Sequence, residues 1–194
     1  MNKATPMLAI IAVLCGQSAV QKPSGKRVSN ELFLVNDEQR NEWCAYANES
    51  LWKSQVDTVG ADTVATLSFF ETHLTSIEVT TQDETGDWLM IDHYTLGTAG
   101  DIKQLQRRAN ILPGDRSVSE TFSITNGKAK LEKRDTTSLT PGQKLTSTED
   151  WVPPVPIVTR LEDFPFAPLT ALKHSEVNSK GKICAQVHSA ASIR

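Results

Sequence analysis

The sequence predicts a mainly β protein, with an α+β fold as the alternative, built on a single curved antiparallel β-meander sheet within residues 36–135. Segments rich in β-branched and aromatic residues follow one another from Thr63 to Asp135, which is typical of strands. Tight turns connect these segments and leave no room for the crossover helices of a parallel sheet. A short N-terminal helix and an irregular, proline-rich C-terminal strap are expected to complete one domain.

Residues 1–19 are expected to be a cleaved export signal. Lys3 supplies a positive n-region, and Met7–Cys15 is a short apolar h-region followed by small residues,. This apolar run is shorter than the roughly 20 residues that cross a bilayer, so no transmembrane span is expected in the mature chain. The mature protein is then periplasmic or extracellular, with residues 20–35 as a flexible lead. Lipidation of Cys15 is an alternative that would anchor it to a membrane.

Two cysteines, Cys44 and Cys184, remain once the signal is removed. An even number of cysteines suits an oxidising compartment. A disulfide between them closes a loop of 140 residues (184 − 44), which the chain-entropy relation converts to about 4 to 5 kcal/mol. Neither cysteine lies in a CxxC pair, which argues against a redox motif or a zinc site. We therefore predict a Cys44–Cys184 disulfide and no cofactor or metal, with two separate thiols as the alternative.

Residues 37–54 fit two different structures. In the first, Asn36 caps a helix whose positively polarised end carries Asp37 and Glu38,. In the second, residues 43–46 pair as a strand. The sequence leaves both open, although the helix would provide a cover for the apolar face of the sheet.

The first part of the meander has a regular strand pattern. Three strands are expected, over residues 63–71, 75–82 and 88–96. In the second of them Ile77 and Val79 alternate with polar residues, and Trp88–Ile91 in the third is apolar on both faces, which places that strand in the centre of the sheet. Residues 83–87 and 97–101 are the connecting turns, where glycines accommodate positive φ.

The second part of the meander contains the clearest turn signals. Residues 102–112 fit a helix or a strand, and the flanking turns favour the strand. Pro113-Gly114 predicts a type II turn, and Asn126-Gly127 predicts a two-residue hairpin between strands at 118–125 and 128–135. One face of the first of these strands is expected to hold Val118, Glu120, Phe122 and Ile124.

The tail, residues 136–194, is expected to be a polar loop and a proline-rich segment that packs on the same domain. Residues 152–156 read VPPVP and must be extended, because proline fixes φ and lacks a backbone donor. Residues 164–168 carry two phenylalanines without a regular period. We interpret this part as a strap that covers the sheet, followed by a final strand that holds Cys184.

Charge is unevenly distributed along the chain. Residues 31–92 contain 13 acidic and 2 basic residues, a balance of −11, and residues 101–134 contain 8 basic and 4 acidic residues, a balance of +4. Complementary charges on neighbouring strands explain this better than a cationic stripe. Such a stripe would use Lys103, Arg107, Lys128, Lys130 and Arg134. A net charge of −3 and a single aromatic residue in the basic region argue against nucleic acid as a partner.

No catalytic signature is present in the sequence. Two acid–histidine pairs remain, of which Glu71 and His73 are expected on one strand face, and Asp92 and His93 on opposite faces,. The function predicted is therefore that of an exported, non-catalytic scaffold or binding module, whose curved sheet takes a protein or an apolar small molecule. The alternative is an exported enzyme with an acid/base site around Glu71 and His73.

Overall fold

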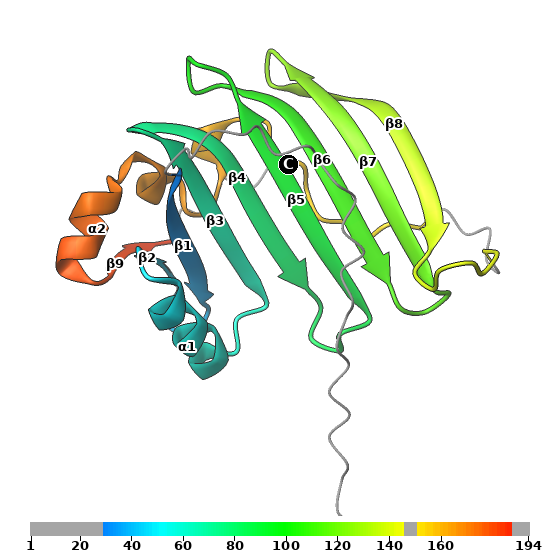
Figure 1. The fold of residues 1–194 in the computed structure, drawn as a ribbon, viewed down its shortest axis with the longest axis horizontal. Coiled ribbons are helices and arrows are strands. Elements are labelled where there is room, and N and C mark those ends of the chain that lie inside the picture. The colour runs from blue at the N-terminus through cyan, green and yellow to red at the C-terminus, as the bar shows by residue number, and fades with distance from the viewer. Residues whose placement is uncertain (1–28, 146–150, 188–194) are drawn as a thin grey trace, which may run out of the picture.

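A computed structural model describes residues 29–145 and 151–187, and its main feature is one nine-stranded antiparallel sheet (Figure 1). The strands are β1 Ser29–Asp37, β2 Glu42–Tyr46, β3 Thr63–Phe70, β4 His73–Gln82, β5 Trp88–Leu96, β6 Ile102–Ile111, β7 Arg116–Thr125, β8 Lys128–Ser138 and β9 Ile183–Gln186. Their order across the sheet is β8-β7-β6-β5-β4-β3-β1-β2-β9. The helices are α1 Glu49–Val59 and α2 His174–Lys180, with short 3-10 helices η1 Leu161–Asp163 and η2 Ala167–Ala171. The predicted mainly β, antiparallel meander is confirmed.

The turns of the meander follow the local sequence. At Pro113-Gly114 the glycine has a φ of 91°, and the amide of Asp115 donates to the carbonyl oxygen of Leu112 at 3.1 Å, as in a type II turn. In the Asn126-Gly127 hairpin both residues have positive φ, 52° and 70°, which is the geometry of a type I′ turn. Residues 102–111 form β6, so the choice of a strand for this segment is also confirmed.

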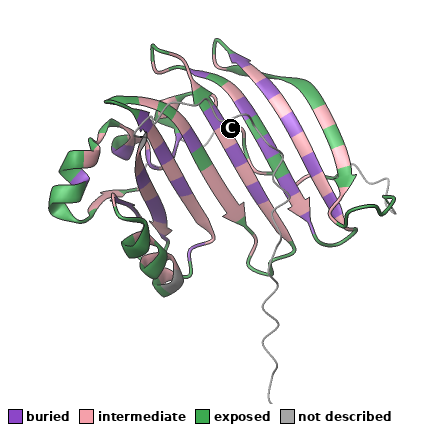
Figure 2. Ribbon diagram, viewed as in Figure 1, coloured by how far each residue is buried: buried purple, intermediate pink, exposed green. Residues whose placement is uncertain are grey.

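The two faces of the sheet are covered by different parts of the chain. Residues 151–172, which we call the strap, pack on one face, named here the strap face. Alternate residues of β1 to β7 point to it, and Figure 2 shows this alternation as bands along the strands. The core on this face includes Leu32, Leu34, Leu67, Ile77, Tyr94, Leu105 and Phe122. Helix α1 packs on the opposite face, mainly against β1 and β2.

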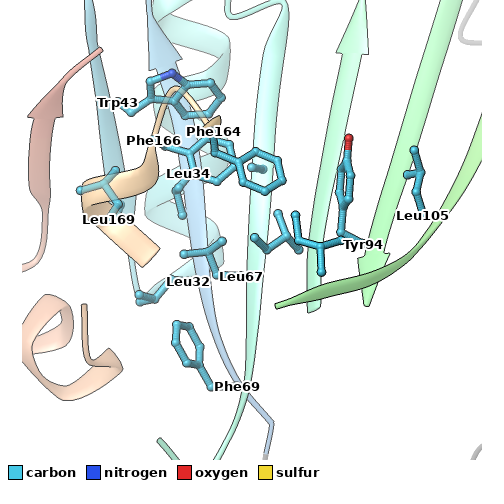
Figure 3. Packing of buried hydrophobic residues seen from close by; sticks show 14 of the residues in the cluster. Leu32, Leu34, Trp43, Leu67, Phe69, Tyr94, Leu105, Phe164, Phe166 and Leu169 are labelled. Atoms are coloured by element: carbon cyan, nitrogen blue, oxygen red, sulfur yellow. The ribbon is translucent and has the colours of Figure 1, made fainter. Parts of the chain in front are cut away.

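Aromatic rings fasten the strap to the sheet (Figure 3). Phe164 and Phe166 stack on each other with ring centroids 4.9 Å apart. Phe166 also contacts Trp43 of β2 edge-on at 4.9 Å, and Phe164 contacts Tyr94 of β5 edge-on at 5.1 Å. All four side chains are at most 2% exposed. The irregular strap expected from the prolines is therefore an integral part of the core, because its two phenylalanines join distant strands.

The helix predicted to start after Asn36 is wrong, and the strand alternative is correct. Residues 42–46 form β2, in which Trp43 and Cys44 point to opposite faces and both are buried. In a strand that lies between β1 and β9, side chains on both faces are buried, whereas a surface helix buries only one face. The helix begins 12 residues later (48 − 36), where the Oδ1 atom of Asn48 accepts hydrogen bonds from the amides of Ser50 and Leu51 at 2.9 and 3.1 Å.

The flexible lead predicted for residues 20–35 is contradicted from Ser29 onward, where strand β1 begins. This strand lies between β3 and β2. Leu32 and Leu34 enter the core on the strap face, while Phe33 on the other face stacks against Trp52 of α1 at 5.4 Å. Both faces of β1 are therefore covered, which explains why this strand is apolar on both sides.

The predicted export signal, residues 1–19, and Cys15 lie outside the described residues. Within residues 29–145 and 151–187, no helix combines the length and the apolar character that a bilayer crossing requires.

Candidate ligand-binding site

A cavity of about 640 Å³ lies between the strap and the strap face of the sheet. The sheet side is formed by Trp43, Thr63, Val79, Thr81, Asp92 and Tyr94, and the strap side by residues 155–159 and 163–166. The strap is held on the sheet by the phenylalanines at one end of the cavity and by Arg107 at the other. The volume of the cavity falls in the range of small-molecule sites, roughly 300 to 1,000 Å³.

The wall of this cavity is apolar with a few polar groups. Val79, Val155 and Ile157 supply apolar surface, and the threonines supply hydroxyl groups. The carboxylate of Asp92 is the only charged group on the sheet side of the described lining. Walls of this kind hold an apolar body and orient it through a small number of polar contacts.

A buried ion pair joins the sheet to the strap. Nε and Nη2 of Arg107 donate to the two carboxylate oxygens of Asp92 at 2.7 and 2.6 Å, with both side chains 6% exposed. Nη1 of Arg107 also donates to the carbonyl oxygen of Val155 in the strap at 3.0 Å. This bidentate hydrogen bonding between Arg107 and Asp92 is strong and directional. Burial lowers the pKa of Arg107, but the hydrogen bonds and charge of Asp92 outweigh burial, so its pKa is raised.

The pair belongs to a row of alternating charges across four strands. Asp92 of β5 is opposite Arg107 of β6, which is opposite Glu120 of β7, which is opposite Arg134 of β8. The carboxylate of Glu120 lies 3.7 Å from Nε of Arg134. The opposite charges of the acidic and basic parts of the sequence therefore meet on neighbouring strands in this row.

Tyr94 provides a second polar link between sheet and strap. Its hydroxyl accepts a hydrogen bond from the amide of Val158 at 3.3 Å and donates to Asp92 at 3.4 Å. Figure 3 shows this hydroxyl pointing away from the apolar cluster at the base of its ring. Burial is the main cause that raises its pKa, and the charge of Asp92 raises it further. Tyr94 is therefore neutral at ordinary pH and serves as a hydrogen-bonding group.

We expect the folded protein to resist ionisation of both of its tyrosines, Tyr46 and Tyr94. Burial raises the pKa of each above the ordinary value of 10.0. A raised pKa in the folded state contributes stability that is complete below pH 10 and is lost as the pH rises above it. The free energy of unfolding should then fall by up to about 1.4 kcal/mol per pH unit for each tyrosine. Urea unfolding at several alkaline pH values checks this, with Tyr94→Phe expected to reduce the slope. A tyrosinate absorbance at pH 10 in a chain with native circular dichroism would contradict it.

The acid–histidine pairs predicted from the sequence lie outside the cavity, except for Asp92. Glu71 lies in the β3–β4 turn with a φ of 56°, and His73 begins β4, both exposed. The prediction that one strand face presents both is wrong, because the chain reverses between them. Asp92 and His93 do point to opposite faces. His93 lies on the face away from the cavity, with Nδ1 3.8 Å from Glu78, and hydrogen bonding to His93 lowers the pKa of Glu78.

The cationic stripe weighed in the sequence does not form, because two β-bulges separate its members. Lys103 is the extra residue where β6 shifts register against β5, and it is exposed and paired with Asp101. Arg107 is buried against Asp92. A second bulge in β8 places Arg134 opposite Glu120 on the strap face. The remaining members, Lys128 and Lys130, belong to the exposed part of β8.

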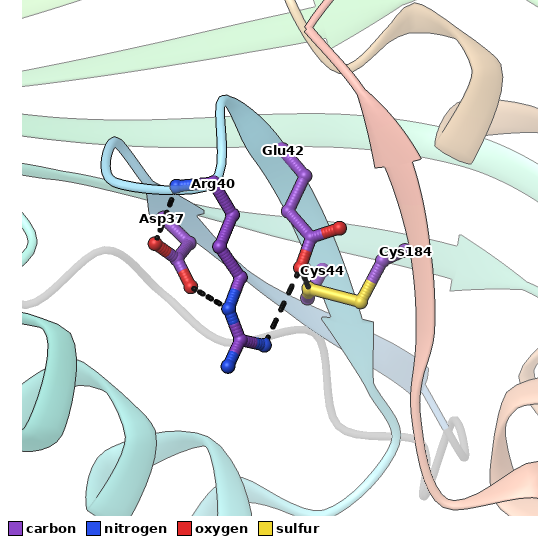
Figure 4. The surroundings of a disulfide bond; sticks show 5 residues. All are labelled: Asp37, Arg40, Glu42, Cys44 and Cys184. Carbon is purple, nitrogen blue, oxygen red and sulfur yellow. Dashed lines mark hydrogen bonds and ion pairs between the residues drawn. A yellow bond between two sulfur atoms is a disulfide. The ribbon is translucent and has the colours of Figure 1, made fainter.

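The predicted disulfide between Cys44 and Cys184 is confirmed (Figure 4). The two cysteines are directly opposite each other on β2 and β9, with Cα atoms 4.0 Å apart. They lie on the face away from the cavity, in a cluster with Val35, Tyr46 and residues of α1. Arg40 lies nearby, with ion pairs to Asp37 and Glu42 at 3.6 and 3.8 Å. The bond therefore holds the edge of the sheet and does not line the cavity.

The cavity was not found by sequence reasoning. Its lining comes from β2, β3, β4, β5 and the strap, and no local motif connects them. The one available signal was the apolar, proline-rich strap itself. No family model, no curated protein and no solved structure matches this chain. The interpretation of the site therefore depends on its geometry and chemistry.

Proposed function

We propose that the protein is an exported, non-catalytic binding module that holds an apolar small molecule under its strap. The observation that carries this proposal is the cavity of about 640 Å³ with predominantly apolar walls. The space is an open cleft between the strap and the sheet, and its apolar side chains Val79, Val155 and Ile157 are only partly buried. Concave, mostly apolar clefts of this volume are the usual form of small-molecule sites.

The energetic argument favours an apolar occupant. Val79, Val155 and Ile157 line the cavity and are only partly buried, so they present apolar surface to it. Transfer of apolar surface out of water is favourable by about 25 cal/mol per Å², so a ligand that displaces water from these walls is stabilised in proportion to the area it covers. The strap is joined to the sheet by hydrogen bonds from Arg107 and to Tyr94, which keep the walls in place when no ligand is bound.

Two properties support the exported location. The Cys44–Cys184 disulfide is stable in oxidising compartments outside the cytosol, and residues 1–19 have the pattern of an export signal. The alternative function, an enzyme with an acid/base pair at Glu71 and His73, lacks comparable support. Neither residue lines the cavity, and both are exposed at a turn.

Filling the cavity should weaken binding of an apolar probe. We expect the neutral fluorophore N-phenyl-1-naphthylamine to bind saturably to the wild-type protein. Val79→Phe places a larger side chain in the cavity and should weaken this binding at least about tenfold, equivalent to about 1.4 kcal/mol. Fluorescence titration measures the affinity.

Thr80→Phe is the matched control, because Thr80 follows Val79 on β4 and points to the opposite face,. Urea unfolding of both variants shows that each is folded at the temperature of the titration. Equal binding by the two variants, or no saturable binding by the wild-type protein, would contradict the proposed function.

A further inference from the structure

We propose that the ligand is a cationic amphiphile, with an apolar chain in the cavity and an ammonium head group beside Asn36, Glu38 and Trp43. The inference rests on the proposed function, since it identifies the chemical class that the same cavity takes. It comes from two observations, namely the charges around the cavity and an unsatisfied buried acceptor.

A second hollow of about 410 Å³ adjoins the cavity. It is lined by Asn36, Glu38, Asn41, Trp43, Thr63, Pro165 and Val187. Trp43, Thr63 and Pro165 line both spaces. A ligand whose chain occupies the cavity can therefore place its polar end in this hollow, at the turn between β1 and β2.

Formal charge around the two spaces is negative. Among the described residues that line either of them, none is Lys, Arg or His. Three acids line the two spaces. Asp92 is neutralised by Arg107, whereas Asp163 and Glu38 have no cationic partner within ion-pair distance in the described part of the chain. Arg40, on the same turn as Glu38, is already paired with acids. The net charge offered to a ligand is thus −2, from Asp163 and Glu38.

Asn36 contributes an acceptor that has no donor. Its Oδ1 atom is buried and makes no hydrogen bond within the described part of the chain. A buried polar atom without a partner costs about 1 to 3 kcal/mol. An ammonium group carries only donors, so it would satisfy this oxygen, whereas a carboxylate carries only acceptors and would not.

Trp43 lies where the cavity meets the hollow, and its ring packs edge-on against Phe166 (Figure 3). An anionic head group would have unfavourable electrostatic interactions at this site. It would be repelled by Asp163 and Glu38, and the donors of Arg107 are already used by Asp92 and the strap carbonyls. Removal of an anion from water without a compensating cation is unfavourable.

Three probes with the same chain and different head groups test the proposal. Dodecylamine, dodecanol and dodecanoate are titrated below the concentrations at which they form micelles, each displacing N-phenyl-1-naphthylamine from the wild-type protein. At neutral pH the amine is protonated and the acid ionised. We expect dodecylamine to bind most tightly, at least about tenfold more tightly than dodecanoate, because the two head groups differ by two unit charges, Glu38 lines the hollow and Asp163 lines the adjoining cavity,.

Dodecanoate binding as tightly as dodecylamine, or more tightly, would overturn the proposed ligand class and leave the apolar site intact. Displacement by none of the three probes would instead overturn the proposed function. The two failures are therefore distinguishable in one experiment.

Charge variants test the role of the acids. The double variant Glu38→Gln/Asp163→Asn should reduce the affinity for dodecylamine about threefold or more and leave the affinity for dodecanol unchanged. Glu162→Gln is the matched control, since Glu162 neighbours Asp163 and is exposed like it, but lines neither space. If the double variant retains the wild-type ratio of amine to carboxylate affinity, the acids do not select the head group and the proposal is wrong.

Discussion

Replacement of Arg107 by methionine is expected to lower the free energy of unfolding by about 3 to 5 kcal/mol. The substitution leaves the carboxylate of Asp92 without its partner in a site where it is 6% exposed. It also removes the donor to the strap carbonyl of Val155. An uncompensated buried charge is strongly unfavourable, whereas loss of an exposed ion pair changes stability by about 1 kcal/mol or less. Urea unfolding followed by circular dichroism measures the difference.

Two further variants separate the buried charge from simple loss of packing. Asp92→Leu/Arg107→Met replaces both charges with apolar side chains and should recover most of the lost stability, because the unpaired carboxylate is gone. Lys103→Met on the same strand is the exposed control, since Lys103 pairs with Asp101 at the surface. If Arg107→Met and Lys103→Met have equal effects, the pair does not clamp the strap to the sheet.

Removal of the disulfide is expected to have an effect of similar size. The variant Cys44→Ala/Cys184→Ala should lose about 4 to 5 kcal/mol, because the bond closes a loop of 140 residues and restricts the unfolded chain. The loss should be concentrated at the edge of the sheet. Strand β9 pairs with β2 over only four residue pairs, and helix α2, which directly precedes β9 in the chain, packs in the core through Val177.

Urea unfolding of the wild-type protein with and without a reductant checks the disulfide prediction, since the reduced protein should match the double variant. Binding of N-phenyl-1-naphthylamine by the folded fraction should remain, because Cys44 and Cys184 face away from the cavity. A double variant within about 0.5 kcal/mol of the wild type, the range of ordinary surface substitutions, would contradict the prediction.

Most of the meander could be predicted from local sequence. Alternation in residues 118–125 and the Asn126-Gly127 turn define β7, β8 and their hairpin, because side-chain alternation and positive φ depend only on neighbouring residues. The strap was predicted from its prolines in the same way. Strand β1 was missed because Leu32 to Val35 is apolar on both faces, and the strap and α1, which cover these faces, are brought there only by the tertiary structure.

The candidate site was much less accessible to prediction. Asp92 and Arg107 face each other because Lys103 is an extra residue in β6. Counting back from the turn without this bulge would place Asp92 opposite Gln106. A single inserted residue changes the face on which every later side chain lies, and nothing in the composition of the strand marks it. The same effect separates Arg134 from Lys130 on β8.

By itself, then, the sequence determined the class of fold, the strand order of the meander and the cysteine pair, because turns, alternation and an even cysteine count are local or compositional properties. Only the tertiary structure decided that a cavity exists, what lines it and which charges surround it. The cavity depends on where the strap crosses the sheet, and its anchors, such as Tyr94 with Val158, are 64 residues apart. Contacts at such separation arise from packing of the whole chain, so no local pattern encodes them.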